Sequence, residues 1–496
     1  MKSSLNAARR RRELAQVAEE QVDVLVVGLG ATGAGVALDA AARGLSVAAV
    51  DAHDLAFGTS RWSSKMIHGG LRYLAKGQVG VARESAVERG VLLAATAPHM
   101  VRAQPYLLPL TPAVSRGQAA LTMTGYLLGD GLRAAARTPR RLLPGPSRLG
   151  ARRARELAPV LEPDGLRGAL LSWDGRLLDD ARLVVAIART AAAHGARVLT
   201  RCRALELGRS GARVRDELTG EEFTVRARVV VNAAGVWAGG LVPDVTLRPS
   251  RGTHLVLRPG TLPGLRAGLH VPIPGELNRF ALVLPQADGR VYVGLTDEPV
   301  QGPVPDVPEA PEEDVSALLG VLNTVLGSPV TRDRVAGAYA GLRPLLDSPA
   351  GRTADLSRRH AVLVSGEGVV TVVGGKLTTY RRMAQDAVDR AVALAGLPAG
   401  PSGTTRIPLA GAGPVAVGVP RRLAERYGGE AGAALELVRR YPEEVGLGLT
   451  LGDLVWAVRH EGALDEGDLL DRRTRIGLVP EDRTAALAAA TAALAC

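Results

Sequence analysis

One stretch, Val22–Asp51, constrains the fold more than any other part of the chain. Val22–Val27 is a short, apolar, largely β-branched run, which is typical of a buried parallel strand. The turn Gly28-Leu29-Gly30-Ala31-Thr32-Gly33 follows it, and an Ala-rich helical stretch then runs to Arg43. A second apolar run, Leu45–Val50, leads into Asp51. The pattern predicts a strand–helix–strand unit with its glycines in the first turn.

The glycines of this unit predict a site for a dinucleotide. Gly28 allows the tight turn, Gly30 lets a pyrophosphate approach the backbone, and Gly33 lets helix and strand pack closely. The helix N-terminus, which includes Thr32, offers N–H groups to the diphosphate. Asp51 stands where a carboxylate holds ribose hydroxyls. A glycine turn used only for packing is the alternative, and the motif alone does not separate NAD from FAD.

Length and composition indicate a globular chain of two or three domains, with 496 residues, 46% apolar and 22% charged. Cys202 and Cys496 have no metal or disulfide spacing, so no metal site is expected and a reducing, cytoplasmic setting fits. Residues 1–20 carry four arginines at 9–12 but no apolar core, so they do not form a signal peptide. No apolar run is long enough to span a bilayer, so any membrane contact is expected to be peripheral.

The net charge of +11 allows nucleic acid, an anionic membrane surface or an anionic substrate as the partner. Fifty-seven arginines stand against four lysines, which is the mark of a codon bias that inflates arginine. The four lysines are therefore informative. Where the codon bias favours arginine, a lysine indicates that the position requires a compact ammonium group. Lys65 and Lys376 both lie in motif-rich stretches.

Three further stretches resemble ligand-binding turns. Thr59–Gly70 combines small hydroxyl donors with Lys65 and a His-Gly-Gly turn, although a polar surface loop is the alternative. Arg226–Trp237 reads as a strand that ends in Asn-Ala-Ala-Gly. Val369–Tyr380 reads as a buried strand, two glycines and a helix start, which directs a second helix dipole at a ligand. One strand–helix–strand unit cannot hold both ends of a long cofactor, so these stretches together indicate FAD.

The segment 119–155 pairs an apolar stretch with a basic run. Residues 119–132 include Met123, Tyr126, Leu127 and Leu128, and eight arginines follow without an acid between 133 and 155. This pattern favours peripheral contact with anionic lipid, while a solvated linker enriched in arginine is the alternative. Nucleic-acid binding is not expected, because aromatic residues make up 3% of the chain and do not alternate with the arginines.

The expected fold is mixed α/β (α+β), with a Rossmann-like FAD-binding domain, an interleaved and mostly antiparallel substrate domain, and a C-terminal helical domain. The FAD-binding domain is assigned to residues 20–95, 166–245 and 346–396. The substrate or cap domain is assigned to residues 96–165 and 246–345. Residues 397–420 are expected to be a linker, and residues 421–496 the helical domain.

The motifs together resemble those of the FAD-dependent glycerol-3-phosphate dehydrogenases, the respiratory flavoenzymes. The resemblance covers most of the chain, and its specific motifs are T-S-R-W-S-S-K-M-I-H-G-G-L-R-Y-L at 59–74 and G-G-K-L-T-T-Y-R at 374–381. It includes D-D-A-R-L at 179–183, R-G-T-H at 251–254, G-L-R-P-L at 341–345 and A-V-R-H-E-G-A-L at 457–464. Trp62, Asp51 and Gln286 depart from the usual pattern.

The resemblance implies oxidation of sn-glycerol 3-phosphate at C2 to dihydroxyacetone phosphate, with hydride passing to flavin N5 and electrons to ubiquinone or menaquinone. It also implies a peripheral position on the inner face of the cytoplasmic membrane and a candidate homodimer. Substrate positions match Arg72, Tyr73, His254, Arg343, Arg358 and Lys376. Cofactor positions match Gly28, Gly30, Thr32, Gly33, Asp51, Thr59, Ser60, Ser64, Lys65, His68, Gly69, Gly235, Trp237, Gly375, Leu377 and Thr378.

Elementary chemistry agrees with these assignments. Several fixed cations suit a dianionic phosphate, and a neutral histidine suits proton removal near pH 7. His254 is the expected base, with Lys376 or Arg343 stabilising the developing alkoxide. A buried core histidine is the alternative for His254.

Three alternative functions remain open at the level of sequence. The first is a glycerol-3-phosphate oxidase that uses oxygen. The second is a related amino-acid oxidase, which would need one arginine clamp for a carboxylate rather than a set of cations. The third is a non-catalytic flavin-fold binding module that the basic run recruits to a membrane or a nucleic acid.

Overall fold

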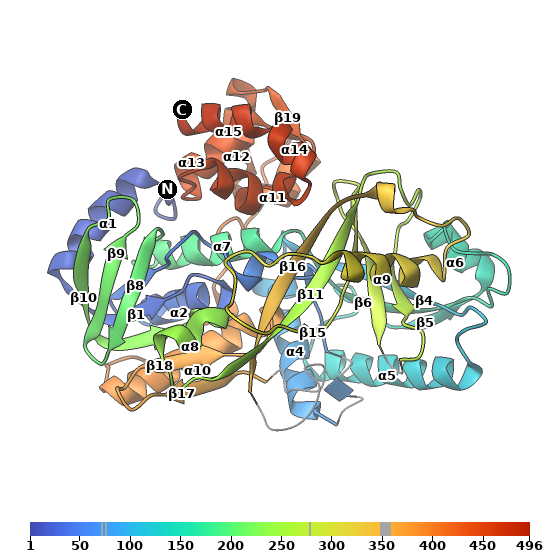
Figure 1. Ribbon diagram of the computed structural model, residues 1–496, viewed down its shortest axis with the longest axis horizontal. Helices are drawn as coiled ribbons and strands as arrows, with labels where there is room; N and C mark the ends of the chain where they lie inside the picture. Colours follow the sequence, from blue (N-terminus) through green and yellow to red (C-terminus); the bar gives the residue numbers. More distant parts are fainter. Residues whose placement is uncertain (71–72, 75–76, 277–278, 348–358) are drawn as a thin grey trace.

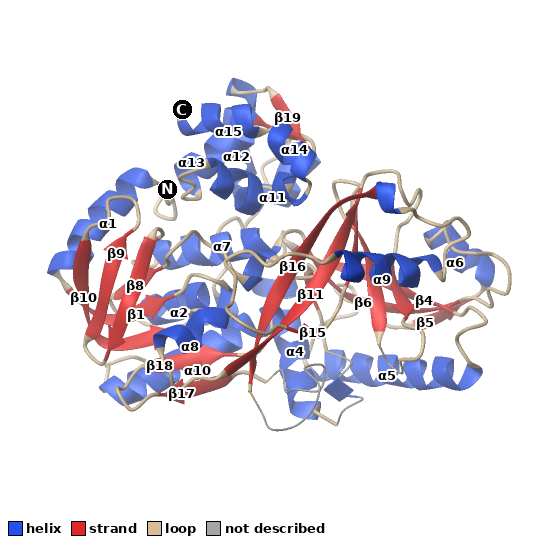
Figure 2. Ribbon diagram, in the orientation of Figure 1, coloured by secondary structure: helices blue, strands red, loops and turns tan. Residues whose placement is uncertain are grey.

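The structure is a computed structural model that describes residues 1–70, 73–74, 77–276, 279–347 and 359–496. Figure 1 shows three parts: one sheet with its helices on the left, a second sheet on the right, and a group of helices above them. Figure 2 shows that helices cover the first sheet and that the second sheet is long and twisted. The mixed α/β class predicted from the sequence is confirmed.

The first sheet is built on the predicted strand–helix–strand unit, which forms β1 (Gln21–Val27), α2 (Ala31–Ala42) and β2 (Val47–Val50). Its main path runs β17-β18-β10-β1-β2-β7. The pairs β18–β10, β10–β1, β1–β2 and β2–β7 are parallel. The other strands of this path are β7 (Arg197–Leu199), β10 (Glu222–Asn232), β17 (Ala361–Val364) and β18 (Val370–Val373). Both downstream glycine turns therefore meet the carboxyl end of β1.

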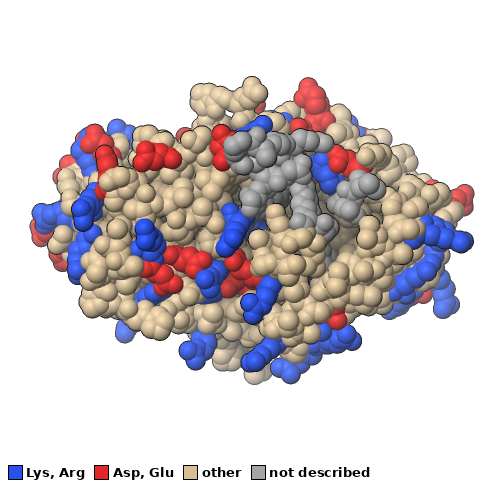
Figure 3. Space-filling view, turned by 90° about the horizontal axis from the view of Figure 1, so that it is seen from below, with Lys and Arg blue, Asp and Glu red and all other residues tan. Residues whose placement is uncertain are grey.

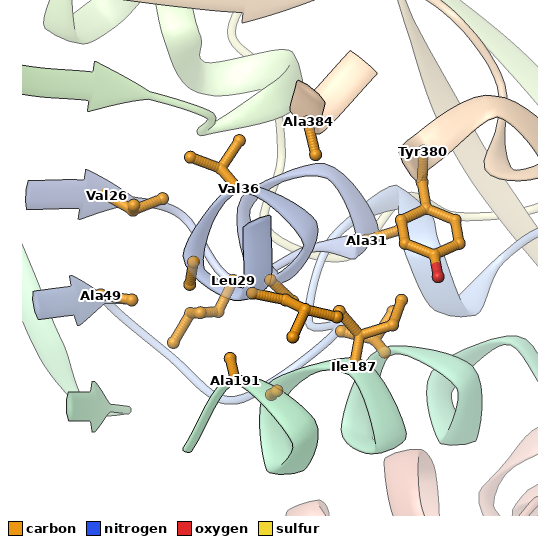
Figure 4. Packing of buried hydrophobic residues seen from close by; sticks show 14 of the residues in the cluster. Val26, Leu29, Ala31, Val36, Ala49, Ile187, Ala191, Tyr380 and Ala384 are labelled. Carbon is orange, nitrogen blue, oxygen red and sulfur yellow. The ribbon is translucent and has the colours of Figure 1, made fainter. Parts of the chain in front are cut away.

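Small residues set the packing of α2. This helix lies between α7 (Asp180–Ala193) and α10 (Tyr380–Ala395), and Figure 4 shows Val36 near Ala384 on one side and Leu29 near Ala191 on the other. A Cβ on Gly35 would lie 3.0 Å from the Tyr380 ring. The Ala- and Gly-rich composition of α2 is therefore what lets two helices approach it so closely.

The chain between Arg197 and Gly208 forms two strands. Arg201 adopts a left-handed φ of 56° and divides β7 from β8 (Cys202–Gly208). β8 and β9 (Gly211–Asp216) then form an antiparallel extension of the sheet on β10. The N-terminal arginine run lies in α1 (Ala7–Glu19), where Arg10 is buried and pairs with Asp216 at 2.6 Å.

The second sheet has ten strands in the order β15-β11-β14-β13-β12-β4-β6-β3, with β16 on β11 and β5 on β6. It is antiparallel except for the pair β12–β4. The strands are β3 (Met66–Ile67), β4 (Val101–Pro109), β5 (Ser147–Leu149), β6 (Ala169–Leu177), β11 (Leu247–Leu257), β12 (Gly268–Pro272), β13 (Phe280–Pro285), β14 (Val291–Gly294), β15 (Glu298–Pro299) and β16 (Val335–Leu346). The predicted hairpin with an Asp-Gly turn is β13–β14.

For β3 and β6, the local sequence did not determine which sheet the strand joins. Both lie in ranges that were assigned to the FAD-binding domain, yet both belong to the second sheet. The Ser-Trp-Asp-Gly-Arg sequence within β6 lacks the regular alternation of apolar and polar residues that indicates a strand. Nine residues of β4 pair with it, so tertiary pairing decides its conformation.

Helices complete the molecule. α5 (Arg116–Ala135) and α9 (Glu312–Asn323) contact the second sheet, and α6 (Ala151–Leu157) packs against its core. α4 (Val79–Val91) contacts α5, and α8 (Ala238–Leu241) follows β10. The upper part in Figure 1 contains α11 (Arg421–Tyr427), α12 (Ala431–Arg440), α13 (Leu451–His460), α14 (Pro480–Ala485) and α15 (Leu487–Leu494), with a small hairpin of β19 (Glu444–Gly446) and β20 (Leu449–Thr450). Among the described residues, no helix has the length and apolarity to cross a membrane.

The segment 397–420, expected as a linker, packs onto the first part of the molecule. Leu397 and Leu409 are buried with the core of the first sheet. Thr404 donates to Asp39 and accepts from Arg381. Residues 397–409 therefore pack along α2 and α10, whereas residues 413–418 are exposed.

Candidate functional site

A cavity of about 1110 Å³, open to the surface, lies between the two sheets. This volume is at the upper end of the roughly 300–1,000 Å³ range of small-molecule sites, so it suits a large cofactor together with a substrate. Its wall includes nearly all of the described residues predicted to bind cofactor or substrate: Gly28, Gly30, Thr32, Asp51, Thr59, Ser60, Ser64, His68, Tyr73, Gly235, Trp237, His254, Arg343, Gly375, Lys376, Leu377 and Thr378.

The first wall is the turn from β1 into α2. Gly28 has a φ of +98°, and a Cβ there would lie 2.6 Å from the Ala233 carbonyl oxygen. Gly33 does not line the cavity but serves its predicted packing role, since its Cβ would lie 1.8 Å from the Gly28 oxygen. The Ala31 N–H donates to the Ser60 hydroxyl at 2.9 Å. An open helix N-terminus bordered by glycine is suited to a diphosphate.

Asp51 ends β2 at the edge of the cavity. Its carboxylate accepts the Leu29 N–H at 2.6 Å and the His53 N–H at 2.8 Å. Burial raises the pKa of this carboxyl to about 6, and the two backbone donors only partly offset that effect. A fixed carboxylate beside the glycine turn can accept the hydroxyls of a ribose.

The turn after β10 lines the same cavity and packs against the glycine turn after β1. The Asn232 side chain is fully buried, donates to the Ala238 oxygen at 3.1 Å and accepts the Ala234 N–H at 3.2 Å. It thereby holds Ala233–Gly235 in position. Trp237 packs against Gly58, where a Cβ would lie 2.8 Å from the indole ring. These small residues leave the backbone open for a cofactor.

His254 lies on β11 with its ring against Tyr339, at 4.8 Å between centroids and 10° between planes. Its Nε2 is 2.8 Å from the Ser64 hydroxyl. Gly294 is required opposite, because a Cβ there would lie 2.2 Å from the imidazole. Burial, followed by the charges of Lys65 and Arg343, holds the pKa of His254 well below its usual value. The imidazole is therefore neutral near pH 7 and able to accept a proton.

Arg343 lies on β16 directly opposite Ser250 of β11. Its guanidinium pairs with Asp297 at 3.1 Å and donates to the Thr296 carbonyl at 3.0 Å and the Ser250 hydroxyl at 3.1 Å. These contacts fix a cation in the cavity wall on the same strand pair as His254. Fixed guanidinium groups are the preferred partners of phosphate oxygens.

Lys376 follows the second glycine turn. Gly374 and Gly375 have φ values of +79° and +71°, and a Cβ on Gly375 would lie 2.4 Å from the Met383 sulfur. The Lys376 ammonium donates to the Ser85 hydroxyl and lies 4.3 Å from the centroid of the Tyr73 ring. The structure thus brings Lys376, Tyr73, His254 and Arg343 to one cavity. Arg72 and Arg358 lie outside the described residues.

Lys65 and Gly69 were expected to contact the cofactor, but neither lines the cavity. The Lys65 ammonium is buried, pairs with Asp180 at 3.0 Å and donates to the Arg61 carbonyl at 2.8 Å. The Gly69 N–H donates to Asp174, which Arg89 holds. A lysine can be retained for a buried ion pair as well as for a ligand, so the contact of Lys65 with the cofactor stays a prediction.

The cavity also has a wall that sequence reasoning did not predict. It consists of Leu121, Gly125, Tyr126 and Leu128 of α5, with His270 and Phe280 from the second sheet. Tyr126 donates to or accepts from His270 Nδ1 at 3.1 Å. The sequence predicts an apolar stretch over residues 119–132. Nothing in the local sequence indicates that this helix lines the same cavity as the glycine turn that follows β1.

Comparison with known proteins identifies the class. The family described as FAD dependent oxidoreductase matches residues 23–381. Glycerol-3-phosphate dehydrogenase 1 of Mycobacterium tuberculosis (strain H37Rv) is 52% identical over 504 residues, which cover 98% of each chain. The solved glycerol-3-phosphate dehydrogenase of Bacillus halodurans complexed with FAD has a TM-score of 0.75 at 27% identity, over 99% of this chain and 94% of that chain.

A more distant structure shares the fold alone. The L-alpha-glycerophosphate oxidase of Mycoplasma pneumoniae has a TM-score of 0.58 at 18% identity, over 77% of this chain and 97% of that chain. The chain therefore belongs to the FAD-dependent oxidoreductases and, within them, to the glycerol-3-phosphate dehydrogenase family. The predicted cofactor, FAD, is confirmed, and the open glycine turns and the fixed Asp51 carboxylate suit it.

Proposed function

We propose that this protein oxidises sn-glycerol 3-phosphate at C2 to dihydroxyacetone phosphate and delivers the electrons to a membrane quinone, ubiquinone or menaquinone. The observation that carries the proposal is the convergence of a neutral histidine and two fixed cations, His254, Arg343 and Lys376, on one cavity. A doubly charged phosphate needs more than one cation, and an alcohol needs a base. The names of the relatives support the same substrate.

His254 is the proposed base for the C2 hydroxyl. Its neutral ring accepts the proton, and its stacking on Tyr339 with Nε2 near Ser64 fixes the direction from which it does so. Arg343 and Lys376 bind the phosphate or stabilise the alkoxide as the proton leaves. Tyr73, Arg72 and Arg358 are proposed as further contacts to the substrate. FAD, when bound, accepts the hydride and holds the two electrons.

The quinone part of the proposal rests on α5. Leu121, Leu127 and Leu128 are exposed on this helix, and Leu121 and Leu128 also line the cavity. An apolar opening beside exposed leucines suits an acceptor that arrives from lipid. Seven arginines of the segment 119–155 are exposed nearby, and Figure 3 shows basic side chains gathered at the right end of the lower face. Arg133 is the exception, because it is buried against Asp130.

The proposal has three further parts. The protein would bind the inner face of the cytoplasmic membrane peripherally through residues 119–155, with no role in nucleic-acid binding. It would form a homodimer. Its FAD-binding domain would comprise residues 20–95, 166–245 and 346–396. Within these ranges, β3 and β6 would pair with the strands of the second sheet.

Anaerobic titration tests the main proposal. Addition of sn-glycerol 3-phosphate to the purified holoenzyme should bleach the flavin absorbance band, whereas glycine or alanine should leave it unchanged. A flavin that stays oxidised in the presence of sn-glycerol 3-phosphate would overturn the assigned substrate. Re-oxidation by a soluble quinone analogue, with little hydrogen peroxide formed in air, is expected for a dehydrogenase. Stoichiometric peroxide would instead identify an oxidase.

A further inference from the structure

The loop Asp51–Trp62 forms a large part of the cavity wall, but the residues in its middle are buried on the side away from the cavity. Residues 51–53, 57–60 and 62 line the cavity, while 54–56 do not. Asp54, Leu55 and Ala56 are each 0% exposed, and Ala56 turns the chain with a left-handed φ of 60°. The loop that is expected to hold the cofactor is therefore fixed by contacts on the side that faces away from the cavity.

The anchor is an ion pair with the C-terminal part of the chain. Arg473 grips the Asp54 carboxylate with both of its terminal nitrogens, at 2.7 and 2.8 Å. Arg472 adds a third hydrogen bond, from Nε at 2.7 Å. Both arginines belong to the short helix Asp468–Arg473, and both are buried. Their charges hold the pKa of Asp54 below its usual value despite its burial.

The same network touches the loop at two more points. The Arg472 guanidinium lies 5.6 Å from the centroid of the Phe57 ring, on which His53 stacks at 3.8 Å. Asp468 accepts from Arg472 and, at 2.6 Å, from Arg201. Arg201 in turn donates its N–H to the His53 carbonyl at 2.6 Å. Phe57 and His53 both line the cavity.

We propose that the C-terminal domain retains FAD by clamping this loop, with Asp54, Arg472 and Arg473 as positioning residues. Among the described residues, none after Met383 lines the cavity, so the domain acts on the cavity through the residues that it holds, and this loop is one of them. The family match to FAD dependent oxidoreductases also ends before these arginines, at residue 381. The domain is therefore an addition to the flavin fold that has become part of its cofactor site.

The physical reason is preorganisation. A buried carboxylate without its arginines is strongly disfavoured, so loop and domain hold their positions together. If the clamp is broken, the loop samples other conformations. Apparent affinity falls in proportion to the population that remains competent to bind. A loop that is competent for about a tenth of the time would bind FAD about tenfold more weakly.

Release of FAD from the holoenzyme tests the proposal without use of the substrate. The variant Asp54→Asn keeps the size of the side chain and removes its charge. On dilution, its flavin should be released with a dissociation constant raised about tenfold or more, seen as an increase in flavin fluorescence. The matched control is Glu430→Gln, which removes another carboxylate of the same interface, bound by Arg189 at 2.7 and 2.8 Å. Among the described residues, no hydrogen bond or ion pair joins Glu430 to the loop or to the two clamp arginines.

The control separates clamping from general stability. Both variants should lower the thermal midpoint, but Glu430→Gln should keep FAD affinity within about twofold of the wild type, because sites that share no partner act independently. Equal FAD release from both variants, or none from Asp54→Asn, would overturn the proposal. The milder variant Arg472→Lys serves if Asp54→Asn does not fold. Its amides at 52–58 should exchange hydrogen faster, and unchanged exchange would contradict the clamp.

Discussion

Single residues decide the chemistry, and His254 shows how. Its ring stacks on Tyr339 and fills the space next to Gly294, where a side chain would clash with it. The Ser64 hydroxyl lies within hydrogen-bond distance of its Nε2. Lys65 acts on it at a distance. The Lys65 ammonium lies 4.6 Å from the centroid of the Tyr339 ring, and its charge contributes to the lowered pKa of His254. A lysine outside the cavity thus helps to keep the proposed base neutral.

Replacement of His254 should slow the chemical step. His254→Asn is expected to reduce flavin reduction by sn-glycerol 3-phosphate about 10²-fold or more, because a positioned base contributes roughly that factor. Stopped-flow absorbance under anaerobic conditions measures the rate. His270→Asn is the matched control, since His270 is a second histidine that lines the same cavity. Equal rates for both variants would reassign the base.

The pH dependence of flavin reduction follows from the same pKa. A base works when it is unprotonated, and His254 remains unprotonated down to a pH well below 6.5. The wild-type rate of flavin reduction should therefore be constant from about pH 8 to about pH 6.5 and should fall only at lower pH. A rate that already halves near pH 7 would contradict a histidine with this environment.

At the scale of elements, strand pairing brings the site together. The register of β11 with β16 places Ser250 opposite Arg343 and His254 opposite Tyr339. One pair of neighbouring strands thus supplies both the proposed base and a proposed phosphate ligand. α5 lies across the mouth of the same cavity and offers exposed leucines beside it.

These leucines should determine membrane affinity. Leu127→Ser with Leu128→Ser is expected to weaken binding to vesicles rich in anionic phospholipid by about tenfold or more, since a buried leucine contributes about 1.5 kcal/mol or more. Vesicle sedimentation at low salt measures the effect. The control is Leu218→Ser, which changes a leucine of similar exposure in the β9–β10 turn. Unchanged sedimentation of the double variant would remove α5 from the proposed contact.

At the scale of the whole molecule, buried ion pairs join the C-terminal helices to the first sheet. Arg182 of α7 pairs with Glu461 at 2.9 Å, and Arg189 pairs with Glu430 at 2.7 Å. Arg475 pairs with Asp179 at 3.1 Å and donates to Gln286 of the second sheet at 2.9 Å. The helical domain therefore contacts both of the other parts of the molecule through charge.

This interface should weaken in acid. Burial alone would raise the pKa of Glu461, but the charges of Arg182, Arg189 and Arg426 lower it to about 2. A lowered carboxyl pKa stabilises the fold above the unfolded value of about 4.3 and ceases to do so as the pH falls towards 2. Urea unfolding should show the wild type losing about 1 kcal/mol more than Glu461→Gln between pH 5.5 and 3.5. Parallel pH profiles would contradict this role.

Local sequence determined the cofactor end of the site. Strand runs such as Val22–Val27 and Val369–Val373 are continuous and β-branched, and the glycine turns after them permit only a few backbone shapes. Their positions and the fold class followed from these short-range preferences. So did the roles of Gly28 and Gly33, since both depend on the absence of a Cβ.

The tertiary structure alone decided which side chains meet. β6 becomes a strand because β4 pairs with it, and Arg201 separates β7 from β8, which pairs with β9. Lys65 pairs with Asp180, and Asp54 is bound by arginines more than 400 residues away along the chain. Such contacts join segments whose local patterns are independent, so only the packed molecule determines them.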